Sequence, residues 1–232
     1  MVTPDLSKEA YTNQLWIYEG FTSFYDDLAL ARAGTVSPAK YLELLGQHLT
    51  RLMLGAGRKL QGAAESSFDA WTRFYKQDAN SVNHIVSYYT KGGIIALGLD
   101  LLLRDKSQNN VSLDDVMREL WNKFGKEQSG TPDDVITTLC RDTFNVDVTE
   151  YLDHVVYNKE DVPLTTWLGN IGLSLHYRRR QAKDDKGGTP PSGRAAKHQF
   201  GGAYKGTDTG VMIQQVRDNT PASEAGLQIN DK

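Results

Sequence analysis

Four side chains that could bind a metal or move a proton lie close together near the N-terminus. Glu19, Thr22, Ser23 and Asp26 are spaced i, i+3, i+4 and i+7, which places them on one side of a helix. The other positions of 15–28 are mostly apolar, so we expect this helix to be buried. A buried carboxylate is costly unless it is paired or binds a metal. Glu19 is therefore either a metal ligand or a structural carboxylate satisfied by backbone donors or an arginine.

The histidines and the single cysteine do not complete a metal site by spacing. No two histidines are spaced i, i+4 and none is followed by glutamate, so H-E-x-x-H is absent; they are His48, His84, His154, His176 and His198. Cys140 has no partner for an internal disulfide, and the helical pattern around it predicts burial as a small apolar residue.

Composition and charge are those of an ordinary globular protein. The net charge of −3 argues against a nucleic-acid partner, although Arg178, Arg179 and Arg180 begin a basic stretch that we interpret as solvated. The longest apolar run, 92–103, is too short to span a membrane and contains Asp100. The composition does not indicate a cellular compartment.

The elements that must position these residues are mainly helices. Ser37-Pro38 and Ser112–Asp115 have the residue types of helix starts, and paired aspartates such as Asp114 and Asp115 fit helix-dipole complementation better than catalysis. A strongly apolar helix is expected from about position 88 to 104. No strand is expected between 12 and 169.

The pattern changes after position 170. Residues 172–178, 200–204 and 210–216 alternate in the manner of strands, and 181–202 has few apolar residues and is interpreted as a mobile loop. We therefore predict an α+β fold, with a helical domain over 1–170 and a smaller β-rich domain over 171–232.

Two motifs carry a resemblance to a known family. Trp16-x-x-Glu19-Gly20-x-Thr22-x-x-Tyr25 resembles the segment that supplies the third zinc ligand in gluzincin metallopeptidases, and most resembles the glycyl aminopeptidase family. Tyr89-Thr90-Lys91-Gly92 is similar to the Tyr-x-Lys-Gly pattern of aminopeptidase N and its relatives. A run like Ser67-Phe68-Asp69-x-Trp71 also occurs in the glycyl aminopeptidases.

The resemblance implies a zinc aminopeptidase with a thermolysin-like helical lobe. Glu19 would be a zinc ligand, Tyr89 would donate a hydrogen bond to the oxyanion of the tetrahedral intermediate, and Ser23 or Asp26 would orient a ligand. The substrates would be peptides with a small N-terminal residue such as glycine or alanine. The two histidine ligands would lie upstream of Met1, so we expect this chain to be a C-terminal fragment that is inactive alone and binds no Zn²⁺ tightly.

The C-terminal stretch resembles part of a PDZ domain, which the glycyl aminopeptidases also carry. Residues 220–231 are similar to the Ser-Pro-Ala-x-x-Ala-Gly-Leu-x-x-Gly-Asp signature, with Asn230 where glycine is usual. Phe200, Gly201 and Gly202 would form the loop that binds the C-terminal carboxylate of a partner peptide. The alternative function is a non-enzymatic helical scaffold carrying this PDZ-type peptide binder.

Overall fold

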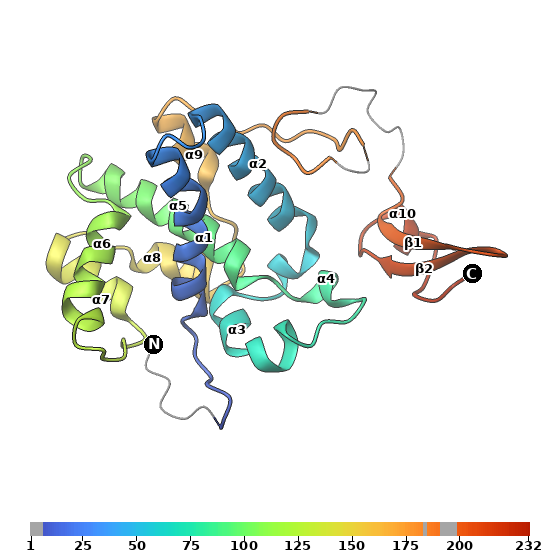
Figure 1. The fold of residues 1–232 in the computed structure, drawn as a ribbon, viewed down its shortest axis with the longest axis horizontal. Coiled ribbons are helices and arrows are strands. Elements are labelled where there is room, and N and C mark those ends of the chain that lie inside the picture. Colours follow the sequence, from blue (N-terminus) through green and yellow to red (C-terminus); the bar gives the residue numbers. More distant parts are fainter. Residues whose placement is uncertain (1–6, 183–184, 191–198) are drawn as a thin grey trace.

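The computed structural model describes residues 7–182, 185–190 and 199–232. Figure 1 shows a helical body joined to a small β unit. The α-helices are α1 (Leu15–Arg32), α2 (Pro38–Leu54), α3 (Ala63–Phe68), α4 (Ser81–His84), α5 (Tyr88–Lys106), α6 (Leu113–Leu120), α7 (Val135–Phe144), α8 (Thr149–Leu152), α9 (Leu164–Asn170) and α10 (Pro221–Glu224). The short 3₁₀ and π helices are η1 (Ala56–Lys59), η2 (Ala70–Phe74), η3 (Trp121–Gly125) and η4 (Asp153–Tyr157), and the strands are β1 (Gly202–Thr207) and β2 (Gly210–Val216). The described chain is thus mainly helical with a small two-stranded sheet, which agrees with the predicted α+β class.

Helices α1 and α5 form the centre of the helical body. Most of α5 is buried, and its close partner is α1, as the apolar patterns of both helices predict. The two backbones meet at Gly20 and Gly92, where a Cβ on Gly20 would lie 2.6 Å from the Gly92 Cα. Such an approach leaves no room for a side chain, so both positions require glycine.

Helix α2 lies beside this central pair. Its predicted start is confirmed: the Ser37 hydroxyl accepts a hydrogen bond from the Lys40 backbone N–H at 3.2 Å, and Pro38 occupies the first helical position. Helix α2 contacts both α1 and α5. The three helices enclose the cleft described below.

The predicted start of α6 is also confirmed. Asp115 accepts a hydrogen bond from the Ser112 backbone N–H at 2.9 Å, which completes a capping box. Asp114, its neighbour, accepts from the Tyr25 hydroxyl at 2.8 Å and from Arg32 at 3.0 Å. Both aspartates are therefore structural groups, because one caps α6 and the other ties α6 to α1. Cys140 is fully buried in α7, as predicted, and burial raises the pKa of its thiol to about 12.

The predicted strand over 172–178 is wrong. These residues form no ladder and run as an irregular segment after α9. The alternation reflects Leu173 and Leu175 packing against the helical core, with polar residues between them facing outward. No neighbouring strand in the described chain offers backbone groups to pair with. The alternating residues therefore form an irregular segment instead of a strand of a sheet.

Part of the basic stretch is held in place by one buried carboxylate. Asp185 is 5% exposed and accepts two hydrogen bonds from Arg178, at 2.6 and 3.0 Å, and others from the Gln181 and Gly187 backbone N–H groups. Residues 183–184 and 191–198 of the predicted mobile loop lie outside the described residues. The mobility of that loop stays a prediction.

The β unit is an antiparallel pair followed by a short helix. Strands β1 and β2 pair from Gly202–Val216 to Thr207–Gly210, with an irregularity between Ala203 and Tyr204. The strand predicted over 210–216 is confirmed, and the one predicted over 200–204 begins two residues later. Asn83 of α4 joins this unit to the helical body: its side chain donates to the Val216 carbonyl at 2.9 Å and accepts from the Asp218 N–H at 3.0 Å.

One stretch of the described chain, 81–106, is long and apolar enough to cross a membrane, and it includes α5. Its apolar window is 72% buried inside the protein. That burial is typical of a core helix, whose apolar surface is covered by its own chain.

Candidate active site

The α1–α5 crossing brings Glu19 and Tyr89 to one region. Glu19 directly precedes Gly20, and Tyr89 lies one turn before Gly92, so both residues flank the point where the two backbones touch. The electrostatic consequence is direct, because the Glu19 charge is one of the causes that raise the pKa of Tyr89. The two sequence motifs are therefore neighbours in space, although seventy positions separate these residues.

The Glu19 carboxylate is half-buried and has no hydrogen bond or ion pair to any residue of 7–182, 185–190 or 199–232. The backbone carbonyl of Glu19, by contrast, accepts from the Thr22 hydroxyl at 2.9 Å and from the Ser23 hydroxyl at 2.7 Å. The structural alternative for Glu19, a carboxylate satisfied by an arginine or backbone donors, is thus not realised within the described chain. An unpaired carboxylate at this depth is available to a ligand.

Tyr89 is the second residue of α5 and belongs to an aromatic cluster. Ser87 caps this helix by accepting from the Thr90 N–H at 3.2 Å. The Tyr89 ring stacks on Tyr88 with ring centroids 4.8 Å apart, and on Phe74 at 6.0 Å. The rings of the adjacent tyrosines therefore lie side by side.

Burial distinguishes the two tyrosines. Tyr88 is 0% exposed and its hydroxyl donates to that of Tyr75 at 3.3 Å, whereas Tyr89 keeps part of its surface in the cleft. Burial first, then hydrogen bonding to Tyr75 and the Glu19 charge, raises the pKa of Tyr89 to about 12. The Tyr89 hydroxyl is therefore a neutral hydrogen-bond donor throughout the physiological pH range.

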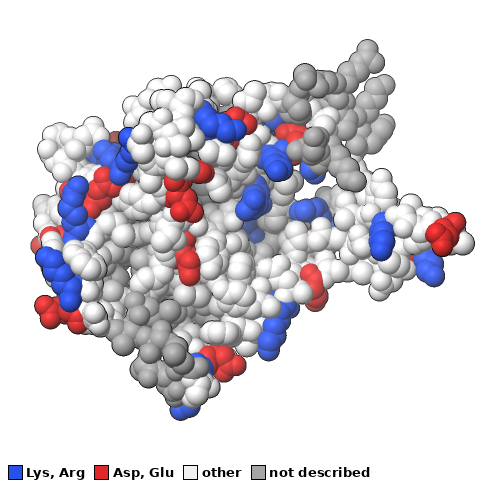
Figure 2. Space-filling model, viewed as in Figure 1, with Lys and Arg blue, Asp and Glu red and all other residues white. Residues whose placement is uncertain are grey.

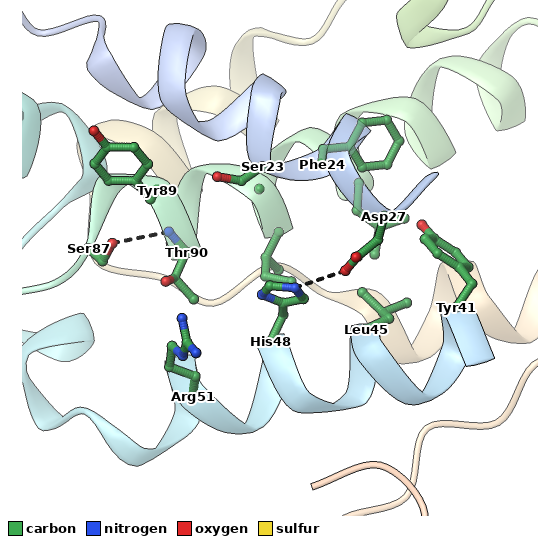
Figure 3. Close-up of a pocket in the computed structure, with 13 residues that line it drawn as sticks. Ser23, Phe24, Asp27, Tyr41, Leu45, His48, Arg51, Ser87, Tyr89 and Thr90 are labelled. Atoms are coloured by element: carbon green, nitrogen blue, oxygen red, sulfur yellow. Dashed lines mark hydrogen bonds and ion pairs between the residues drawn. The ribbon is translucent and has the colours of Figure 1, made fainter. Parts of the chain in front are cut away.

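A cleft of about 360 Å³ lies between α1, α2 and the start of α5 (Figure 3). Its floor is apolar, with Phe24, Leu45 and Ile94 among its lining residues. Polar groups line the walls: Ser23 and Asp27 from α1, His48 and Arg51 from α2, and Ser87, Tyr89 and Thr90 from the start of α5. A concave, largely apolar site with a few polar side chains is the usual form of a ligand site.

Three polar residues of this cleft were not predicted from the sequence. His48 Nε2 lies 3.0 Å from Asp27 Oδ2, across the gap between α2 and α1. Arg51 lies one turn further along α2 and points into the cleft toward Thr90 (Figure 3). None of these residues belongs to a recognisable motif. Only the i, i+3 spacing of His48 and Arg51 on a helix would have indicated a shared face.

The remaining predicted site residues occupy different positions. Ser23 lines the cleft, but its hydroxyl hydrogen is donated to a backbone carbonyl, and Asp26 is exposed. A ligand-orienting role for either stays a prediction. Phe200, Gly201 and Gly202 lie in the β unit, which Figure 1 shows apart from α1 and α5. Gly201 adopts a φ of +85°, and the Phe200 carbonyl accepts from the Ala222 N–H at 3.0 Å.

The residues that the structure describes do not by themselves form a complete catalytic zinc site. Such a site needs three protein ligands, and the described residues contain no group of three or more His, Cys, Asp or Glu side chains that could hold a metal. Glu19 offers one carboxylate at this place. The lack of a partner for this carboxylate fits the role of one ligand in a site whose other ligands come from elsewhere.

Charges on the surface are mixed. The face seen in Figure 2 carries Lys and Arg interspersed with Asp and Glu. This face has no continuous basic stripe of the kind that a nucleic-acid partner would require.

Comparison with known proteins places these features in a family. Residues 1–95 match the family model described as M61 glycyl aminopeptidase, and this segment contains both Glu19 and Tyr89. The chain is similar to the crystal structure of an aminopeptidase N family protein from Idiomarina loihiensis, with 41% identity and a TM-score of 0.92. That similarity covers 99% of this chain and 39% of the other chain. No curated protein matches the sequence.

The match over 1–95 is to the family that the Glu19 and Tyr89 motifs predicted, so the resemblance to the glycyl aminopeptidases is confirmed for this segment. The chain spans about two fifths of the length of the Idiomarina structure. The PDZ assignment of the β unit stays a prediction, because neither similarity names such a domain.

Proposed function

We propose that this chain supplies part of the active site of a zinc aminopeptidase, which hydrolyses the first peptide bond of its substrates. The observation that carries the proposal is the unpaired Glu19 carboxylate beside the α1–α5 crossing, where its charge acts on Tyr89 of the other helix. The match to a family of peptidases supports it, as does the neighbouring cleft, which Tyr89 lines. The preference for a small N-terminal residue, glycine or alanine, rests on the resemblance alone.

Tyr89 would act on the oxygen of the scissile carbonyl. That oxygen becomes negatively charged when the carbonyl carbon turns tetrahedral, and a hydrogen bond aimed at it is stronger in the transition state than in the ground state. A phenol with a pKa of about 12 donates this bond without bringing a charge that needs desolvation. Its stacking on Tyr88 and Phe74 fixes the ring before substrate arrives.

Glu19 would contribute one ligand to the metal, and two further ligands would come from residues outside this sequence. When bound, zinc acts as a Lewis acid toward the peptide carbonyl and lowers the pKa of an attacking water. The part of this chain would be to place Glu19, whose backbone position is set by the close packing of α1 on α5.

The proposal is tested by metal content and turnover of the full-length protein. We expect Glu19→Gln to lower bound zinc and to reduce kcat/KM on alanyl-peptide substrates by at least about a hundredfold, because the neutral amide is a poor zinc ligand. Glu127→Gln makes the same change at an exposed position that does not line the cleft, so it is the matched control and should retain both. Full zinc content and activity in Glu19→Gln would disprove the ligand role.

A second expectation concerns the 232-residue chain by itself. Because it has one candidate ligand, this chain should bind zinc no more tightly than the same 232-residue chain carrying Glu19→Gln. It should also not hydrolyse peptides. Zinc-dependent turnover by the purified chain would show that the residues of this sequence suffice.

A further inference from the structure

Arg51 is the cleft residue that the proposed chemistry leaves without a role. Its side chain lies on the face of α2 that turns toward α5, and its guanidinium points toward Thr90 in Figure 3. A second hollow, bounded by α4 and the start of α5, also includes Arg51 in its lining. Arg51 is a solvent-exposed residue, and it lines both depressions, as Ser87 and Thr90 also do.

Arg51 carries a positive charge that no described carboxylate neutralises. The acidic side chains in the same two depressions have other partners: Asp27 pairs with His48, and Asp78 accepts from the Ser81 hydroxyl at 2.9 Å. The guanidinium nitrogens of Arg51 form no hydrogen bond or ion pair within the described ranges. A cation without a partner, facing a cleft, is complementary to an anion that enters the cleft.

The shape of the guanidinium indicates which anions Arg51 would bind best. Its planar fork of N–H donors matches a carboxylate or phosphate in a bidentate arrangement. The cleft is shared with Tyr89, where the proposed reaction places a peptide, and peptides carry carboxylates at the C-terminus and on acidic side chains. Ser87 and Thr90 lie on the same side of the cleft as Arg51 and add hydroxyl groups there (Figure 3).

We propose that Arg51 is a specificity-determining residue that binds a carboxylate of the peptide substrate downstream of the scissile bond. The inference rests on the proposed peptidase function and deepens it by naming a substrate class: short peptides with a free C-terminal carboxylate, or peptides with an acidic residue near the N-terminus. The preference would be for a charge-bearing substrate over its neutral amide.

Kinetics of the full-length protein with matched substrates test this. One pair is a short alanine peptide with a free carboxylate and its C-terminal amide, and a second pair is two amides that carry glutamate or glutamine in the second position. We expect the wild type to prefer the charged member of at least one pair, and the pair that shows the preference identifies the source of the carboxylate. Arg51→Met should lower kcat/KM for that charged member by about 10- to 100-fold, which corresponds to one charge-assisted hydrogen-bonded pair.

Two further variants test whether the substrate preference depends on the positive charge at position 51. Arg51→Lys keeps the charge and should recover part of the preference, and Lys126→Met removes an exposed cation that does not line the cleft and should leave the preference unchanged. An equal loss on charged and neutral substrates in Arg51→Met, or no preference in the wild type, would overturn the inference.

Titration calorimetry separates this inference from the proposed activity. The same peptides are titrated into the wild type and Arg51→Met, so binding is read without turnover. Selective binding of the charged peptides that is lost in Arg51→Met would support the carboxylate site even if no peptide were hydrolysed. Equal binding of charged and neutral peptides to the wild type would contradict it.

Discussion

Gly20 and Gly92 are in backbone contact at the centre of the protein. A Cβ on Gly20 would lie 2.6 Å from the Gly92 Cα, and a Cβ on Gly92 would lie 2.8 Å from the Gly20 Cα. Because Glu19 adjoins the first glycine and Tyr89 lies one turn before the second, this contact sets the separation of the two candidate site residues. The stability of the core and the geometry of the site thus depend on the same pair of residues.

Substituting either glycine should therefore affect both properties. We expect Gly20→Ala or Gly92→Ala to destabilise the fold by at least about 1–3 kcal/mol, since a methyl group can fit only if the helices move apart. Urea unfolding of the chain measures this. Gly169→Ala in α9, where a Cβ would meet nothing within 4 Å, is the control and should unfold at the same urea concentration as the wild type or higher.

Tyr89 and Tyr88 should differ sharply in function. In the full-length protein, we expect Tyr89→Phe to lower kcat by about 10²- to 10³-fold with little change in KM, because the lost hydrogen bond forms in the transition state. Tyr88→Phe removes only a hydroxyl that bonds to Tyr75, and it should retain most of the activity. Similar losses in the two variants would contradict the assignment of Tyr89 as the donor.

The charge of Glu19 should be detectable in the titration of Tyr89. The folded protein holds the pKa of Tyr89 near 12 and the unfolded chain releases this proton near 10, so this residue stabilises the fold below pH 10 and its contribution is lost as the pH rises to 12. Glu19→Gln should lower the pKa of Tyr89 from about 12, because one negative neighbour is removed. Ultraviolet phenolate absorbance, taken as the difference from Tyr89→Phe, measures it, and an unchanged midpoint would place Glu19 too far away to matter.

Lys91 should make stability depend on pH in the opposite direction. Its ammonium is 1% exposed and has no hydrogen-bond partner in the described chain, and burial lowers its pKa from 10.5 to about 8. The unfolded chain then binds more protons than the folded chain between pH 8 and 10.5, so the wild type becomes more stable as the pH rises through this window.

Lys91→Met removes this dependence. Relative to that variant, the wild type should gain up to about 3 kcal/mol between pH 8 and 10.5, because a tenfold change in proton affinity is worth about 1.4 kcal/mol. Urea unfolding of both proteins below and above this window gives the difference. A constant difference would mean that Lys91 is neutralised by a partner such as Asp161.

Asn83 should control how firmly the β unit is attached. Its side chain bonds to both Val216 and Asp218, and at 3% exposure neither bond can be replaced easily by water. We expect Asn83→Ala to speed proteolysis and amide exchange in residues 199–232 while α5 keeps its protection. Asn122→Ala, at an exposed position of η3, is the control and should change neither.

Local sequence patterns determined the helical part of this protein and the identity of two candidate site residues. The apolar run of α5, the Ser37-Pro38 start and the Ser112–Asp115 capping box could be predicted because each depends on residues within one or two turns of one another. Glu19 and Tyr89 were found in the same way, since each lies in a short motif.

Tertiary structure decided the features that join distant segments. Alternation over 172–178 predicted a strand, but a strand needs a partner and the described chain provides none there. Burial distinguished Tyr89 from Tyr88, and the packing of α2 on α1 and α5 created the cleft with His48 and Arg51. A sequence pattern records the period of one element, whereas a cleft depends on which faces of several elements meet, and that follows only from packing the whole chain.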